Sequence, residues 1–526
     1  MAEMVQVRRP RTNHFAEEPN IRIGRSQFDR SHMLKVGFDA SYLYPILVDE
    51  VLPGDTFTMK LSGFCRITHP LDAPLLDNIT LDTFFFFCPS RILWANWQYF
   101  MGEHDEAGEQ DTDYTIPVLS AGGTVTHNAG AFGGYSLGAH MGLPHGLEPD
   151  ETDVNALPFR AYNLIFNEWF RDQNIQDAVT VNTANGPDAL TGYNLLLSNK
   201  KHDYFTSALP YLQKASGTDV PGVLGTATTL DVETLAVEGN TITVESGSGQ
   251  RDLDSGAAQV DISANNTGSE LFVDVSSLSV DINTLRESVA IQRLLETDAR
   301  GGTRYVEIIK SHFGVTSPDF RLQRPEYLGG GKAYINVNPV ANTDTSQGLV
   351  KAYGTGVIQG HGWAKSFTEH GYILGLIRAR GDITYFQGLD RFWSRSTRYD
   401  FYMPALANLG EQAIYKKELF VNNDGATTDD TVFGYQERWA EYRYKPSKVI
   451  GILNPDATSS LSYWHLAEDF SSAPSLNTTF MQDATPMDRA TTTDTGHQFL
   501  MDLWFNYKCA RPIPVHSIPS LIGKRF

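Results

Sequence analysis

The chain has 526 residues, of which 41% are hydrophobic and 11% aromatic, so it can bury a large core. Its 42 lysines and arginines face 62 aspartates and glutamates, and the net charge of −20 excludes a generally polyanion-binding surface unless basic residues gather on one face. Three widely spaced cysteines, Cys65, Cys88 and Cys509, exclude a disulfide-rich secreted scaffold and a zinc site with CxxC spacing.

The N-terminal segment 1–40 is polar and irregular, which predicts an extended arm. It mixes arginines with acidic residues and lacks the apolar stretch of a signal peptide. No apolar run in the chain approaches the roughly 18 residues that a bilayer-spanning helix needs. We therefore expect a protein that folds in a cytoplasm, without membrane insertion and with its three cysteines reduced.

Strand patterns begin after residue 41. The segments 45–52 and 57–64 are joined by a Pro-Gly-Asp turn, and 57–64 alternates apolar and polar residues with period two. The segment 79–88 contains four consecutive phenylalanines, which suit a strand buried on both faces. Short strands are expected again at 332–337, 371–377 and 499–507.

Two helices stand out among these strands. Behind Pro158, an aromatic and aliphatic stripe recurs at helical spacing from Tyr162 to Phe170, and core packing is its expected role. The segment 283–297 is amphipathic in the same way. No fixed-period repeat occurs, which argues against solenoids and propellers.

The segment 216–285 differs from the chain on either side of it. It holds eleven acidic residues, one cation (Arg251) and one aromatic residue (Phe272). Without it the chain carries 41 basic and 51 acidic residues, so half of the acidic excess lies in this segment. Its short β-branched runs favour a folded acidic lobe that protrudes from a body formed by 41–215 and 286–526, and a disordered acidic linker is the alternative.

The motifs give no support to catalysis. The glycines before Lys332 fail as a phosphate-binding loop, because Glu326 and Ala333 stand where glycine and Ser or Thr are required. Glu369 and His370 are expected to form a hydrogen-bonding pair, and the acidic run 103–113 misses the EF-hand pattern, although a loosely bound cation stays open there. We expect no catalytic residue, cofactor or metal site. A carboxylate pair that meets only in the fold keeps a β-rich glycoside hydrolase or carbohydrate-binding protein as the alternative.

Several sequence segments resemble the major capsid protein of the Microviridae, small phages with single-stranded DNA, and specifically that of the gokushovirus group. One is Phe38-Asp-Ala-Ser-Tyr-Leu-Tyr-Pro and another is Arg391-Phe-Trp-Ser-Arg-Ser-Thr-Arg-Tyr-Asp. The complete set covers 38–55, 160–174, 311–319, 321–330, 391–400, 433–447 and 509–515. The resemblance therefore extends over nearly the whole chain, and it fails in the acidic segment and in parts of 102–153.

The resemblance implies a mainly β fold, an eight-stranded antiparallel jelly roll with long loop insertions and a few helices. It implies a structural subunit of a T=1 icosahedral shell around a circular single-stranded DNA genome, located in the virion and assembled in the host bacterial cytoplasm. The implied partners are other copies of the chain, an internal scaffolding protein, a DNA pilot protein, a small basic DNA-binding protein and a host surface receptor. The segment 216–285 is the candidate for the protrusion at the threefold axes of such shells, where it would contact its own copies and serve in host attachment.

Two stretches also have the composition of a protein interface. The segments 391–399 and 435–444 combine arginine with tryptophan and tyrosine, which are enriched at interface centres. Ordinary surface charge over core aromatics accounts for part of the same pattern.

DNA contacts are expected at the flexible cationic ends of the chain. Because the body is net acidic, phosphate neutralisation must come from a few basic groups and from a separate basic partner. The candidates are Arg8, Arg9, Arg11, Lys524 and Arg525, with binding to neighbouring subunits as the alternative role of these ends.

Overall fold

The chain folds into two compact units, Met1–Tyr211 with Gly302–Phe526, and Leu212–Gly301. The computed structural model describes residues 24–103, 114–120, 134–145, 147, 153–212, 244–246, 249–251, 282–302, 304–342, 350–423, 428–491 and 496–516.

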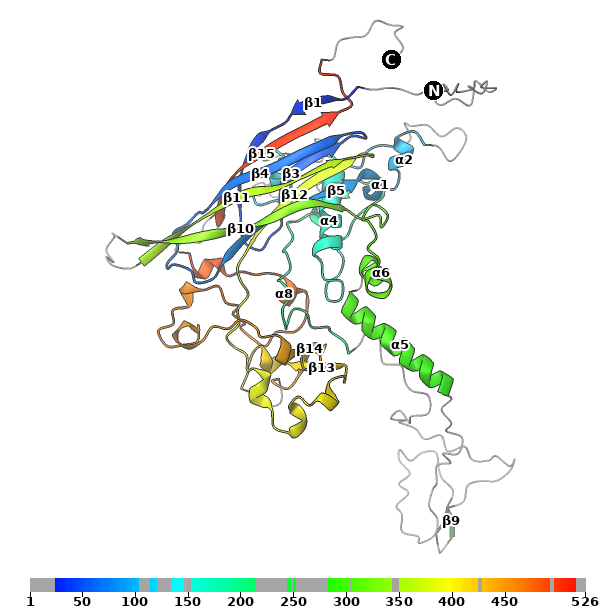
Figure 1. Ribbon diagram of the computed structural model, residues 1–526, viewed down its shortest axis with the longest axis vertical. Coiled ribbons are helices and arrows are strands. Elements are labelled where there is room, and N and C mark those ends of the chain that lie inside the picture. Colours follow the sequence, from blue (N-terminus) through cyan, green and yellow to red (C-terminus); the bar gives the residue numbers. More distant parts are fainter. Residues whose placement is uncertain are drawn as a thin grey trace, which may run out of the picture. The chain divides into compact units, whose positions relative to one another are not determined.

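A curled antiparallel sheet dominates the first unit (Figure 1). Its strands are β1 (Ser26–Asp29), β2 (His32–Phe38), β3 (Tyr44–Val51), β4 (Thr56–Ile67), β5 (Ile79–Pro89), β10 (Glu326–Ala341), β11 (Val350–Ser366), β12 (Gly371–Arg380) and β15 (Phe499–Arg511). Eight of them follow the order β1-β15-β4-β11-β10-β5-β12-β3, and β2 pairs with β15. The expected mainly β class is confirmed, and the curled sheet with few helices is consistent with a capsid jelly roll.

Short elements connect and flank this sheet. The helices are α1 (Ser90–Leu93), α2 (Trp97–Phe100), α3 (Leu137–His140), α4 (Leu157–Ile165), α6 (Tyr305–Phe313), α7 (Ala440–Arg443) and α8 (Thr478–Met481). Two small sheets pair β6 (Leu119–Ser120) with β7 (Asp188–Ala189) and β13 (Glu411–Tyr415) with β14 (Val432–Glu437). No described helix is long and apolar enough to traverse a bilayer.

Period-two alternation explains how the strands build the core. In β15 the side chains of Phe499, Met501, Leu503 and Phe505 are buried, whereas the residues between them are exposed. The strand β4 alternates in the same way, so one face of the sheet packs on a shared apolar core. All six expected strand segments lie in or overlap β3, β4, β5, β10, β12 and β15 and are confirmed.

The strand β5 is buried on both faces, as its phenylalanine run predicted. Phe85 and Phe87 point into the core inside the curl, whereas Phe86 and Cys88 belong to a second core beneath α1 and α4. Within the part of the chain that the structure describes, helices therefore cover the outer face of the sheet over the end that contains β5 and β12 (Figure 1).

The structure differs from the expected arm over the second half of 1–40. The strands β1 and β2 both pair with β15, and Arg30 donates a hydrogen bond of 2.9 Å to Asp49 on β3. Alternating polar residues of an exposed edge look irregular in a sequence, so pairing with β15 could not be predicted. Residues 1–23, and with them Arg8, Arg9 and Arg11, lie outside the described part.

The helix expected behind Pro158 is confirmed as α4. The Asn155 side chain accepts a hydrogen bond of 2.9 Å from the Leu157 amide at its start, and the helix continues as a π-helical turn, Phe166–Phe170. Its stripe is core packing, because Tyr162, Ile165 and Phe166 are buried.

The helix α4 is tied to the rest of the body by a buried ion pair. Arg160 is fully buried, and its guanidinium binds both carboxylate oxygens of Asp188, at 2.7 and 2.8 Å. It also donates to the carbonyls of Leu93 and Ala184. Burial by itself would raise the pKa of Asp188, but hydrogen bonds from Arg160 and Tyr193 outweigh it and lower the pKa below its ordinary value.

The second unit contains the helix α5 (Ile282–Gly301) and a short hairpin of β8 (Val244–Ser246) and β9 (Gly249–Arg251). The helix predicted at 283–297 is confirmed. Most of the acidic segment 216–285 lies outside the described residues, so its protruding lobe stays a prediction.

Candidate subunit interface

The two arginine-rich and aromatic stretches singled out in the sequence come together in the first unit. Helical turns at Arg391–Ser394 and Arg398–Asp400 carry the first stretch, and β14 with α7 carries the second. The buried residue Trp439 also ties the second stretch to the turn at Pro404–Leu406, because its indole N–H donates to the Leu406 carbonyl at 2.9 Å.

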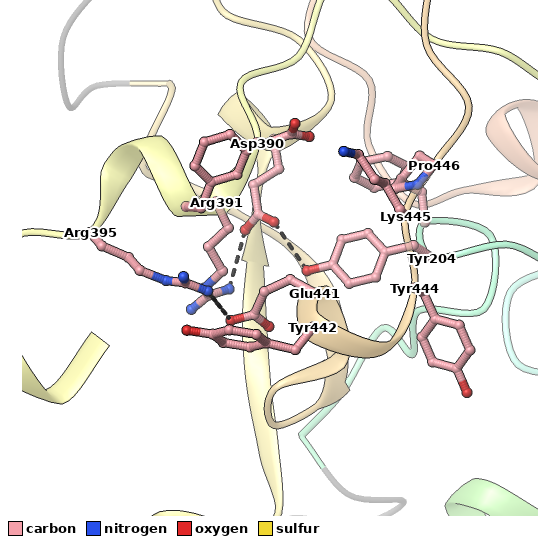
Figure 2. A pocket seen from close by; sticks show the side chains of 12 residues that line it. Tyr204, Asp390, Arg391, Arg395, Glu441, Tyr442, Tyr444, Lys445 and Pro446 are labelled. Carbon is pink, nitrogen blue, oxygen red and sulfur yellow. Dashed lines mark hydrogen bonds and ion pairs between the residues drawn. The ribbon is translucent and has the colours of Figure 1, made fainter. Parts of the chain in front are cut away.

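A network of ion pairs joins these elements around a pocket of about 230 Å³ (Figure 2). Arg391 lies 3.2 Å from Glu418 and 4.0 Å from Glu441, and Arg395 lies 3.2 Å from Glu441. The Tyr204 hydroxyl donates to Glu418 at 3.0 Å. The network therefore connects four separate segments of the chain, at Tyr204, Arg391 with Arg395, Glu418 and Glu441.

Burial shapes the electrostatics of this pocket. It raises the pKa of Glu418, although the Arg391 charge and the hydrogen bond from Tyr204 act in the opposite direction. It also raises the pKa of the Tyr204 phenol, together with the charge of Glu418. The Arg395 guanidinium stacks over the Tyr442 ring, with 4.3 Å to the ring centroid.

The two glutamates of the pocket do not form a catalytic pair. One oxygen of Glu418 accepts from Arg391 and the Tyr415 amide, and the other accepts from Tyr204. One oxygen of Glu441 accepts from Arg395, and the other accepts from Gln412 at 2.6 Å. Because all four oxygens are occupied by the protein, the arrangement fits a structural network better than general acid and base catalysis.

Around this network, large aromatic side chains face solvent. Trp393 and Tyr399 each keep 69% of their surface exposed. The exposed group consists of Phe392, Trp393, Tyr399, Phe401, Tyr402, Tyr442 and Tyr444, with Ile450 and Ile452 nearby in the sequence. A concentration of exposed rings around pre-ordered arginines is typical of a surface that another protein covers. We call these residues, with Arg391 and Arg395, the arginine–aromatic surface.

Other residues considered in the sequence have structural roles. Gly330 lies in β10, where an added Cβ would come within 2.0 Å of the Thr83 carbonyl oxygen, so these glycines permit close strand packing. The expected pair of Glu369 and His370 is wrong. Glu369 accepts from Arg91 at 2.6 Å, whereas the His370 ring packs against Trp97.

The expectation for the cysteines is confirmed, because Cys65, Cys88 and Cys509 are free and buried. Burial raises the pKa of the Cys65 thiol to about 12. No group of three or more potential metal ligands occurs among the described residues. Lys524, Arg525 and most of the acidic run 103–113 lie outside the described part.

Sequence reasoning missed the ion pairs that join distant segments. Arg160 and Asp188 are 28 residues apart, and Asp82 binds Arg378 and Arg380 nearly three hundred residues away. The only signal for them was the presence of charged residues inside otherwise apolar helical and strand patterns.

Comparisons with known proteins match capsid proteins over nearly the whole length of the chain. The family model described as "Capsid protein (F protein)" matches residues 16–521. The chain is 43% identical to capsid protein VP1 of Bdellovibrio phage phiMH2K and 40% identical to capsid protein VP1 of Chlamydia phage 1. It is 33% identical to capsid protein VP1 of Spiroplasma virus 4, and each match covers 97% of this chain and 98% of the relative.

Proposed function

The chain belongs to the phage capsid protein (F protein) family, and on that premise we propose that it forms a T=1 icosahedral shell around circular single-stranded DNA. The resemblance to Microviridae major capsid proteins is confirmed. The protein is thus a structural, non-enzymatic subunit of the virion that assembles with its own copies into a shell.

The arginine–aromatic surface supports the assembly part of the proposal. Its rings are exposed in the single chain, and its arginines are already held by Glu418 and Glu441, so little side-chain entropy remains to be lost when a neighbour covers it. Aromatic residues and arginine supply most of the binding energy in protein interfaces. We assign this surface to a contact between neighbouring subunits.

A double substitution tests this assignment. Trp393→Ala with Tyr399→Ala removes two exposed rings without touching the ion pairs, so the subunit should fold normally and shells should fail to form. Tyr305→Ala on α6 is the matched control, because Tyr305 is also 69% exposed. Electron microscopy and particle mass are the readouts. Normal yields of shells from the double variant would contradict the assignment.

The remaining partners rest on the family resemblance. We propose an internal scaffolding protein, a DNA pilot protein and a small basic DNA-binding protein as partners, and assembly in the host bacterial cytoplasm. The chain ends, with Arg8, Arg9, Arg11, Lys524 and Arg525, would share DNA contact with that basic partner. Normal packaging after changing all five to Ala, and also after removing the partner, would overturn this part.

For the acidic segment 216–285 we propose a protrusion at the threefold axes that serves in host attachment. Three copies of an acidic segment repel one another around a threefold axis, so apolar contacts, hydrogen bonds or bound cations must hold them together. Replacing the segment by a short Gly-Ser linker should leave shells intact and abolish adsorption to host cells. Loss of all particles would refute the protrusion, and normal adsorption would refute the role in attachment.

A further inference from the structure

Among the described residues, the outer face of the sheet keeps exposed side chains over the end that contains β2, β15, β4, β11 and β10. Residues of β15 that alternate with the core positions are exposed, and the pairing register continues this face onto the neighbouring strands. Trp504 is paired with Met33 on β2 and with Ser62 on β4, and Asp502 is paired with Phe64. We call these outward positions the bare face, together with Asp29 and the other outward positions of the edge strand β1.

Four aromatic rings lie on the bare face. Phe64, Trp504, Tyr353 and Tyr334 keep 36%, 46%, 49% and 55% of their surfaces exposed. Phe64 on β4 is paired with Val357 on β11, whose other neighbour is β10, the strand that carries Tyr334. Since adjacent strands are about 4.8 Å apart, Phe64 and Tyr334 are separated by about 10 Å across the sheet, and Trp504 is a diagonal neighbour of Phe64. Phe64, Trp504 and Tyr334 therefore lie in a row that spans β15, β4, β11 and β10, whereas Tyr353 lies away from this row on β11, where it is paired with Asn338.

The charge of the bare face is opposite to that of the chain. Its exposed charged side chains are five basic and two acidic, whereas the whole chain has 42 basic and 62 acidic residues. The basic ones are Lys35, Lys60, Arg66, Lys332 and Lys508, and the acidic ones are Asp29 and Asp502. Lys35, Lys60 and Lys332 form no ion pair with another described residue.

The cations are placed beside the rings. Arg66 lies over Phe64 with 4.7 Å to the ring centroid, and Lys332 lies 4.9 Å from the centroid of Tyr334. An occupant of this face must be anionic and must offer flat apolar surfaces that can stack on the rings. Single-stranded nucleic acid has both properties, whereas the bases of a duplex are already stacked on one another.

We infer that the bare face is a binding platform for single-stranded DNA, on which unpaired bases stack on the aromatic row while the lysines neutralise phosphates. The inference rests on the proposed function, because it requires that this face points to the interior of the shell. A contact with a second copy of the chain fits less well, since lysine is depleted at interface centres and Lys35, Lys60 and Lys332 form no ion pair with another described residue. The arginine–aromatic surface, with its paired arginines, shows the contrasting pattern.

Two variants of the full chain test the platform. The ring variant combines Phe64→Ala, Trp504→Ala and Tyr334→Ala, and the charge variant combines Lys35→Gln, Lys60→Gln and Lys332→Gln. The probe is a fluorescein-labelled oligothymidine, with a duplex of equal length for comparison, and binding is followed by anisotropy at several salt concentrations. Unchanged unfolding midpoints in urea establish that each variant is folded.

The platform predicts different effects for the two variants. The ring variant should bind oligothymidine at least tenfold more weakly, with its duplex affinity nearly unchanged. The charge variant should bind both oligothymidine and the duplex more weakly. Its single-strand binding should also depend less on salt, with the slope of log K against log salt reduced by about 2. The Trp393→Ala and Tyr399→Ala variant is the control and should bind oligothymidine like the unaltered chain.

The outcomes separate this inference from the proposed function. Variants that bind oligothymidine normally but form no shells would show that the bare face is a contact between copies, and the platform would be wrong. Equal weakening of oligothymidine and duplex by the ring variant would refute stacking. Failure of the unaltered chain to form shells would contradict the proposed function. The platform is tested separately, because oligothymidine binding is measured on the chain whether or not shells form.

Discussion

Replacing Arg160 by methionine would leave the Asp188 carboxylate buried without its counter-charge. Arg160 donates two hydrogen bonds to Asp188 and one each to the carbonyls of Leu93 and Ala184, and its side chain is entirely shielded from solvent. Removing one partner of such a pair costs about 3–5 kcal/mol of unfolding free energy. Tyr193 and Asn182 still donate to Asp188 in the variant, so we expect the lower half of that range.

A double-mutant cycle measures this coupling. Urea unfolding of unassembled subunits, followed by tryptophan fluorescence, should show a loss of about 3 kcal/mol for Arg160→Met. Arg160→Met with Asp188→Asn should recover at least about 1 kcal/mol of that loss, because the amide removes the uncompensated charge. Arg321→Met, at an exposed arginine, is the control and should change stability by less than about 0.5 kcal/mol. Strictly additive effects of the two substitutions would refute the reasoning.

Three further predictions concern pH, cysteine chemistry and strand packing. Burial, together with the charge of Glu468, raises the pKa of Asp483 to about 6 from an ordinary 3.8, so its contribution to stability is present below pH 3.8 and is lost as the pH rises through 6. The free energy of unfolding of Asp483→Asn at pH 8 should therefore exceed that of the unaltered chain by up to about 3 kcal/mol. An equal increase at pH 3 would contradict this explanation. Because all three thiols are free and buried, dithiothreitol should leave shells intact, and a thiol reagent should label the cysteines only after the protein is unfolded. Shells that dissolve on reduction would disprove this prediction. Gly330→Ala should lower the urea midpoint, since the new methyl group would meet the Thr83 carbonyl, whereas Gly314→Ala at an open position with φ of +69° should show only the smaller cost of its backbone conformation.

The sequence alone predicted the elements in which one local period is uninterrupted. Alternation in 57–64, the phenylalanine run in 79–88 and the helical stripe behind Pro158 each reflect which side chains a single strand or helix must bury, and that information is local. The family phrases likewise predicted the capsid function, because they extend along nearly the whole chain.

Only the tertiary structure decided which distant residues meet. The pairing of Ser26–Asp29 and His32–Phe38 with β15, the burial of Arg160 against Asp188 and the partner of Glu369 all depend on contacts between segments far apart in the chain. The arginine–aromatic surface was visible in composition, but the ion pairs that hold its arginines became apparent only when Tyr204, Glu418 and Glu441 were brought together. The bare face was not predictable at all, because alternation shows that one side of a strand is buried but cannot show whether helices cover the other side.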